Sequence, residues 1–110
     1  MKIIVFANEQ EIIELINAKS FEEVIEFGKN LNKLLIITRS EKGSLAIQAQ
    51  NIIECDSKKN LKIVDLTGAG DLFAAGFFNG YLSKKSIKES LTNGTEMASK
   101  IIQKIGARLN

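Results

Sequence analysis

The feature that most limits the fold is the alternation of short apolar segments with longer segments of helical periodicity. Residues 2–6 (KIIVF) and 33–40 (KLLIITRS) are apolar and rich in β-branched side chains, which predicts two buried strands. Residues 8–18 and 20–31 repeat apolar side chains at helical spacing, so we expect two helices between those strands. Strands that alternate with helices are typical of an α/β layer architecture with a partly parallel sheet.

The second half of the chain continues this alternation. Residues 44–50 (SLAIQAQ) follow a turn and alternate in polarity, which predicts a half-exposed strand in an antiparallel hairpin. Residues 51–56 and 61–67 suggest two further short strands. Residues 68–82 and 86–106 have the composition and spacing of helices.

Several helix ends carry recognisable signals. Ser20 with Glu23, and Ser86 with Glu89, have the spacing of capping boxes. Gly106 is expected to end the last helix, because glycine readily adopts the left-handed conformation of a helix terminus. Asn93 and Gly94 are poor helix formers and are expected to weaken or divide the same helix.

Composition bounds the function. The 110 residues suffice for one small domain, 1–110, and 45% hydrophobic with 25% charged residues is ordinary for a globular protein. A net charge of +2, with interspersed charges, argues against nucleic acid or a membrane surface as partner. One cysteine, Cys55, and no histidine argue against a disulfide or a zinc site. A cytoplasmic setting is the expectation.

The stretch VDLTGAGDLF, residues 64–73, leads from a predicted strand through a glycine turn into a helix. The first turn of a helix has free N–H groups and suits an anion, and Gly68 and Gly70 allow a phosphate to approach the backbone closely. Asp71 would repel that phosphate, but a carboxylate there can take the proton of a hydroxyl that attacks it. The alternative is that Asp71 is an ordinary helix N-cap.

Two further segments can also be interpreted in two ways. Asn8 and Glu11 in NEQE have the spacing of a capping box, but they also supply the oxygen ligands that a hydrated magnesium prefers. Residues 38–44 (TRSEKGS) can be a simple hairpin turn. They also sit at a strand end, where open α/β sheets bind ligands.

Taken in order, NEQE (8–11), ITRSEKGS (37–44) and DLTGAGD (65–71) resemble the ribokinase (PfkB) family of sugar and nucleoside kinases. The D-x-T-G-A-G-D element is the most specific of the three. Residues 93–108 are similar to the last nucleotide-side helix of that family, in adenosine kinases particularly. The resemblance covers nearly the whole chain and implies the C-terminal portion of a ribokinase-like three-layer α/β/α fold, with a partly parallel sheet and a β-hairpin.

The resemblance implies a transfer of the γ-phosphoryl of Mg·ATP onto a hydroxyl of a sugar or nucleoside, with an adenosine-like acceptor favoured. It makes Asp71 the general base. The implied anion hole is the backbone of Gly68, Ala69, Gly70 and Asp71. The implied nucleotide contacts are Thr38, Arg39, Ser40, Gly43, Asn93 and Thr95. The implied cation ligands are Asn8 and Glu11 for Mg²⁺, through water, and Asp65 and Thr67 for K⁺ in members that use it.

This chain departs from the family pattern in two residues and in length. Leu66 stands where the family usually has Thr, Ser or Pro, and Ser40 stands where many members have Gly. Family members are much longer, and their N-terminal part carries the acceptor-binding residues, a lid and several strands. We therefore expect an ATP-side part of a kinase that is inactive alone and that pairs with the missing N-terminal part or self-associates. The alternative is a non-catalytic nucleotide-binding or relic domain.

Overall fold

The computed structural model describes residues 3–56 and 69–109. Its sheet consists of four strands in the spatial order β1 (Ile4–Asn8), β2 (Leu34–Thr38), β3 (Ser44–Gln48) and β4 (Asn51–Cys55). β1 and β2 are parallel, whereas the β2–β3 and β3–β4 pairs are antiparallel. The partly parallel sheet with a hairpin is thus confirmed. The half-exposed character expected of residues 44–50 is wrong, because the first four residues of β3 are buried between the two helical layers. The strand expected at 61–67 lies outside the described residues.

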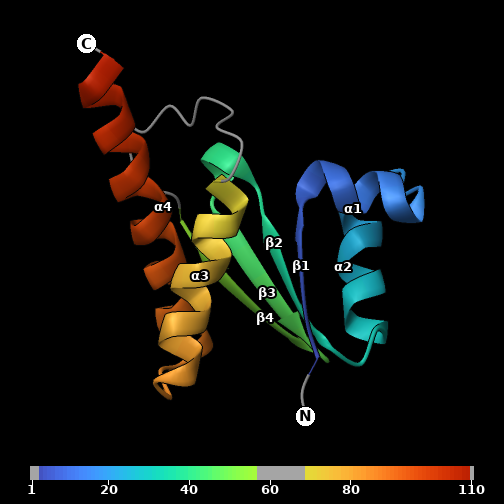
Figure 1. Cartoon of the computed structure of the whole chain (residues 1–110). Coiled ribbons are helices and arrows are strands. Elements are labelled where there is room, and N and C mark those ends of the chain that lie inside the picture. The colour runs from blue at the N-terminus through green and yellow to red at the C-terminus, as the bar shows by residue number, and fades with distance from the viewer. Residues whose placement is uncertain (1–2, 57–68, 110) are drawn as a thin grey trace.

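Helices cover both faces of this sheet, as Figure 1 shows. The α-helices are α1 (Glu9–Ile16), α2 (Phe21–Asn30), α3 (Ala69–Leu82) and α4 (Ile87–Leu109), and a 3-10 turn, η1, spans Ser40–Lys42. α1 and α2 lie on one face, while α3 and α4 lie on the other (Figure 1), which confirms the expected three layers. Of the helices in the described part of the chain, none has the length and apolarity to cross a bilayer.

β2 is the centre of the hydrophobic core because both of its faces are buried. Leu34 and Ile36 point toward α3 and α4, while Leu35 and Ile37 point toward α1 and α2. Each of these four side chains is at most 1% exposed. Successive side chains of a strand point to opposite faces, so a continuous apolar run requires a helical layer on each side.

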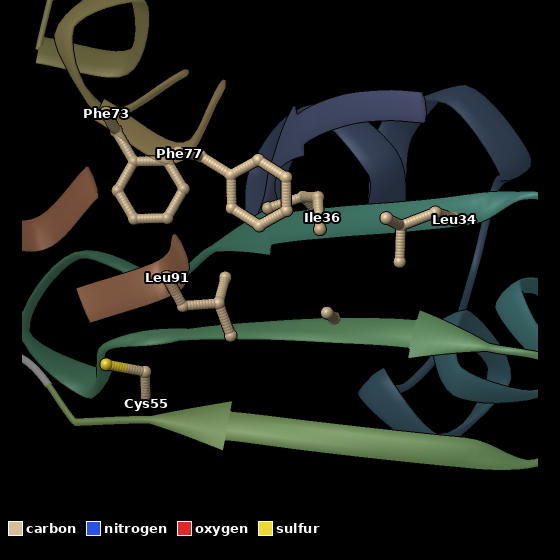
Figure 2. Close-up of a cluster of buried hydrophobic side chains, with 7 residues drawn as sticks. Leu34, Ile36, Cys55, Phe73, Phe77 and Leu91 are labelled. Atoms are coloured by element: carbon tan, nitrogen blue, oxygen red, sulfur yellow. The ribbon is translucent and has the colours of Figure 1, made fainter. Parts of the chain in front are cut away.

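The core on the α3/α4 side is built around aromatic rings. Phe77 and Leu91, both fully buried, meet Ile36 above the sheet, and Cys55 and Phe73 close the same cluster (Figure 2). The ring of Phe6 on β1 meets that of Phe77 edge-on, with 5.5 Å between centroids. Edge-to-face aromatic pairs add to the free energy of burial, so α3 is anchored to the sheet at a defined position.

α3 and α4 approach each other through glycines. A Cβ on Gly94 would lie 2.7 Å from the carbonyl oxygen of Phe73, and one on Gly76 would lie 2.7 Å from that of Asn93. These separations are too short for a side chain of any kind. The expectation that Asn93 and Gly94 divide the last helix is therefore wrong: α4 continues through both residues, and Gly94 serves close packing against α3.

The other helix ends give a mixed outcome. The Ser86–Glu89 cap is present, since the Ser86 hydroxyl accepts the Glu89 N–H at 3.1 Å and donates to its carboxylate at 3.0 Å. The Ser20–Glu23 box is wrong: Ser20 makes no side-chain cap bond, and the Glu23 carboxylate accepts the N–H of Lys19 instead. Gly106 is not a terminus either, because α4 runs on to Leu109. A single glycine costs a helix only about 1 kcal/mol, which does not stop it.

The β2–β3 connection depends on two unusual backbone conformations. The Arg39 N–H donates to the Gly43 carbonyl at 2.7 Å, and the Gly43 N–H donates to the Ser40 carbonyl at 3.1 Å. Gly43 has φ 92° and ψ −142°, a region that only glycine enters readily. Ser40 has φ 52°, so a residue with a side chain occupies a left-handed position.

Gly94→Ala should destabilise the protein, although alanine is the better helix former by about 1 kcal/mol. The added methyl would lie 2.7 Å from the Phe73 backbone and 2.9 Å from its ring, so α3 and α4 must separate. Overpacking of this kind costs about 1–3 kcal/mol. Urea unfolding of both proteins measures the difference, and a variant as stable as the parent would contradict the close contact.

Ser40→Gly should stabilise the protein by up to about 1 kcal/mol. A left-handed residue that carries a Cβ costs the folded state roughly 1–2 kcal/mol. Replacement by glycine recovers only part of that free energy, because glycine has more conformational freedom in the unfolded chain. Ser40→Ala is the matched control, because it removes the hydroxyl and keeps the Cβ. The denaturation midpoint should rise for the glycine variant alone, and an equal rise in both variants would show that φ is not the cause.

Candidate functional site

Polar and small residues lie in a row across one end of the sheet. The strand register places Asn8 beside Thr38, Thr38 beside Ser44 and Ser44 beside Cys55. The carboxyl ends of the parallel pair β1 and β2 are at this end. α1, η1 and α3 all begin there as well (Figure 1), so three helical N-termini meet one strip of the sheet.

Asn8 and Glu11 form the first part of the site. The Asn8 side-chain oxygen accepts the Glu11 N–H at 2.7 Å, and the Glu11 Oε1 accepts the Asn8 N–H at 2.9 Å. The capping box is therefore present, with both exposed side chains held at the strand end. The cap uses one carboxylate oxygen of Glu11 and leaves the second oxygen available to a ligand.

This geometry fits a hydrated magnesium ion. The residues whose side chains the structure describes hold no group of three His, Cys, Asp or Glu that could enclose a metal. A cation here would rely on one or two protein oxygens, water and a phosphate, which is how Mg²⁺ is commonly bound. The second oxygen of Glu11 suits that role, and the Asn8 amide nitrogen, a donor, suits a phosphate oxygen.

The loop from Thr38 to Gly43 forms the second part. Thr38 ends β2 beside Asn8, and the backbone then turns sharply through Ser40 and Gly43. Thr38 is partly accessible and Ser40 is exposed, so this turn presents backbone and hydroxyl groups at the sheet end. The loop that holds the four residues expected to contact a nucleotide here therefore lies next to the Asn8–Glu11 cap in space. These residues are Thr38, Arg39, Ser40 and Gly43.

The side chain of Arg39 is engaged within the protein. Its Nε lies 3.3 Å from Oε2 of Glu9, the first residue of α1, and its guanidinium carbon lies 3.8 Å from the ring centre of Phe21, the first residue of α2. Glu9 and Phe21 were not among the predicted site residues. Both are the first residue of a helix, but sequence alone gives no reason to pair them with Arg39, which is 30 residues from Glu9.

The N-terminus of α3 is the third part. Ala69, Gly70 and Asp71 occupy its first turn, so the expected anion-binding residues are helical at the sheet end. The Asp71 side chain is not among those described. Gly68, Asp65 and Thr67 lie outside the described residues.

Asn93 and Thr95 are placed along the contact of α4 with α3. The Asn93 amide nitrogen lies 3.0 Å from where a Cβ of Gly80 would be, and the Thr95 hydroxyl donates to the Leu91 carbonyl at 3.0 Å. Gly80 is about three helical turns from the start of α3. Gly94, which lies between them in sequence, contacts Phe73 in the second turn of α3, so the two residues lie in the middle of the α3–α4 contact.

Ser44 belongs to the site end and was not predicted. It is 5% exposed, and its hydroxyl has no hydrogen-bond partner among the described residues. Ser44 is two residues from Ala46 on the same strand, so both side chains lie on the α3/α4 face of the sheet. Its pairing with Thr38 places it at the end of the sheet. Sequence alone marks it only as the first residue after the glycine turn.

Comparison with known proteins gives consistent matches. The model of the pfkB family carbohydrate kinases matches residues 3–110. The cytidine kinase of Thermococcus kodakarensis is 34% identical over 105 residues, which are 94% of this chain and 38% of that protein. The nucleoside kinase of Methanocaldococcus jannaschii is 30% identical over 105 residues, 96% of this chain and 34% of that protein.

Solved structures show the same relation. The crystal structure of adenosine kinase from Sinorhizobium meliloti superimposes with a TM-score of 0.83 and 37% identity, over 91% of this chain and 31% of that one. The chain therefore spans about a third of the length of these relatives. The fold is that of the ribokinase-like kinases, and the chain belongs to the pfkB family of carbohydrate kinases.

Proposed function

We propose that this chain forms the nucleotide-binding, C-terminal part of an ATP-dependent kinase that phosphorylates a hydroxyl of a sugar or nucleoside. The observation that carries the proposal is the start of α3 at Ala69, which brings Gly70 and Asp71 to the same sheet end as Asn8 and Thr38. The named activities of the relatives, on cytidine and on nucleosides, favour a nucleoside acceptor. The adenosine kinase structure supports the same class.

The phosphates of ATP would lie against the first turn of α3. In a helix that starts at Ala69, the backbone N–H groups of the first turn, those of Ala69, Gly70 and Asp71, have no carbonyl partner within the helix. The N–H of Gly68 is proposed to join them at the phosphate. Such groups hold the negative charge that develops on a transferred phosphoryl. Glycines in this turn leave space for the phosphate oxygens.

Asp71 would act as the general base. Its carboxylate takes the proton of the acceptor hydroxyl while the hydroxyl oxygen forms a bond to the γ-phosphorus. The bond from that phosphorus to the β–γ bridging oxygen breaks, and ADP leaves with the electron pair. Because the reaction is mainly one of alignment and charge, a helix start that fixes both groups is a suitable platform.

The remaining residues would position the nucleotide. Thr38, Ser40 and Gly43 supply the turn that faces the adenosine part, with Arg39 in the same loop and Asn93 and Thr95 on α4 further along. Asn8 and Glu11 would hold Mg²⁺ through water, and bound Mg²⁺ neutralises phosphate charge. Asp65 and Thr67 are proposed to lie at a K⁺ site.

The proposal is tested by equilibrium binding of Mg·ATP to the 110-residue chain, together with ADP release in the presence of adenosine, cytidine, ribose or fructose. We expect saturable binding and no acceptor-dependent turnover, because the chain spans about a third of its relatives' length. Failure to bind Mg·ATP would contradict the proposed function. Binding without transfer, even after the remaining two thirds of the fold is supplied, would favour a non-catalytic nucleotide-binding module.

Asp71→Asn should abolish transfer and leave nucleotide binding intact. In an enzyme that carries this segment with the rest of the fold, kcat should fall at least about 100-fold, since general-base catalysis contributes roughly 10²–10⁴-fold. Asparagine has nearly the same size as aspartate, so the first turn of α3 should persist. Paired measurements of kcat and the Kd of ATP decide the matter, and a near-normal kcat would reduce Asp71 to a structural residue.

Gly70→Val is the contrasting variant. A branched side chain in the first turn of α3 would block the approach of a phosphate to the backbone. ATP binding and turnover should therefore be lost together, unlike in Asp71→Asn. The same two measurements apply, and retained ATP affinity would place the phosphates elsewhere.

A further inference from the structure

Arg39 is the residue of the Thr38–Gly43 loop whose side chain is held from two sides. Nε donates to Glu9 Oε2 at 3.3 Å, and the guanidinium carbon lies over the ring of Phe21, 3.8 Å from its centre. About a fifth of the Arg39 side chain and a quarter of the Glu9 side chain remain exposed, at 21% and 26%. An arginine both stacked on a ring and bonded through its edge has little freedom to reach a ligand.

These contacts place Arg39 on the α1/α2 side of the sheet. Phe21 packs against the cluster that contains Val24 and Leu35, whereas α3 covers the opposite face (Figure 1). The guanidinium is thus directed away from the start of α3. The Arg39 side chain can therefore influence the end of the sheet only through the residues that it contacts.

The neighbour that matters is Glu9. It directly follows Asn8 and opens α1, whose first turn carries two carboxylates, Glu9 and Glu11. An unpaired Glu9 would add a negative charge beside the strip where the phosphates of ATP are proposed to bind. Arg39 compensates that charge and, from its position next to Thr38, joins the β1–α1 junction to the β2–η1 loop.

We propose that Arg39 is a positioning residue for nucleotide binding: it acts by neutralising and holding Glu9, and it makes no contact with the nucleotide itself. This inference rests on the proposed function. It predicts that the effect of removing Arg39 depends on Glu9. A direct phosphate contact by Arg39 predicts an effect that is independent of Glu9.

The experiment measures the Kd of Mg·ATP for the 110-residue chain and four variants: Arg39→Met, Arg39→Lys, Glu9→Gln and the double variant Arg39→Met with Glu9→Gln. Arg39→Met should raise Kd about tenfold, the size of one charge interaction at a partly exposed site. The double variant should return to within about twofold of the parent, because the uncompensated carboxylate is gone. Arg39→Lys keeps the positive charge, so its Kd should lie between that of Arg39→Met and that of the double variant.

Two further readouts distinguish this role from a merely structural one. Raising the ionic strength to about 1 M, where the Debye length is about 3 Å, should shrink the Arg39→Met effect. Thermal unfolding of each variant shows whether it is folded at the temperature of the binding assay.

Lys29→Met is the matched control. Lys29 pairs with Glu26 at 3.8 Å near the far end of α2, so the loss of this pair should leave the Kd of Mg·ATP unchanged.

Each outcome has a distinct meaning. A double variant as weak as Arg39→Met would overturn the inference in favour of direct contact. Normal affinity of Arg39→Met, with the parent binding Mg·ATP, would overturn the inference alone. A parent chain that binds no Mg·ATP at any ionic strength would overturn the proposed function and this inference together.

Discussion

Burial of β2 on both of its faces is the constraint on which the rest of the structure depends. Four consecutive residues, Leu34 to Ile37, are almost fully removed from water, and they alternate between the two hydrophobic clusters. Such a strand is stable only with helices on both sides, since each fully buried aliphatic side chain contributes about 1.5–3 kcal/mol. The α1/α2 layer and the α3/α4 layer are therefore both required by one five-residue segment.

The same strand determines which polar residues meet at one end of the sheet. Because β1 runs parallel to β2, the two strands finish at the same end of the sheet. Their last residues, Asn8 and Thr38, are polar and lie side by side there. α3 covers the α3/α4 face of the sheet and begins at that same end (Figure 1), so its first-turn N–H groups lie at the end of the sheet where Asn8 and Thr38 lie.

The helical layer of α3 and α4 shows how packing overrides local preference. Asn93 and Gly94 weaken a helix when considered alone, yet α4 passes through them without a break. The missing side chain at Gly94 lets the Phe73 backbone come close, and the van der Waals attraction between the two helices offsets the lower propensity. Phe77, held in the same layer by Phe6 and Tyr81, then fixes α3 against the sheet.

The sequence by itself determined what depends on near neighbours along the chain. Periodicity located the strands and helices of the described residues, and the Asn8–Glu11 and Ser86–Glu89 caps, each three residues apart, followed from local geometry. The ordered motifs identified the family. That Asn8, Thr38 and the start of α3 share one end of the sheet depends on the strand order, which the structure supplied. Tertiary structure alone decided the pairing of Arg39 with Glu9, thirty residues away, the close contact at Gly94, and the burial of Ser44. These depend on which surfaces meet once the layers are packed, and no local pattern encodes the distance between side chains on separate elements.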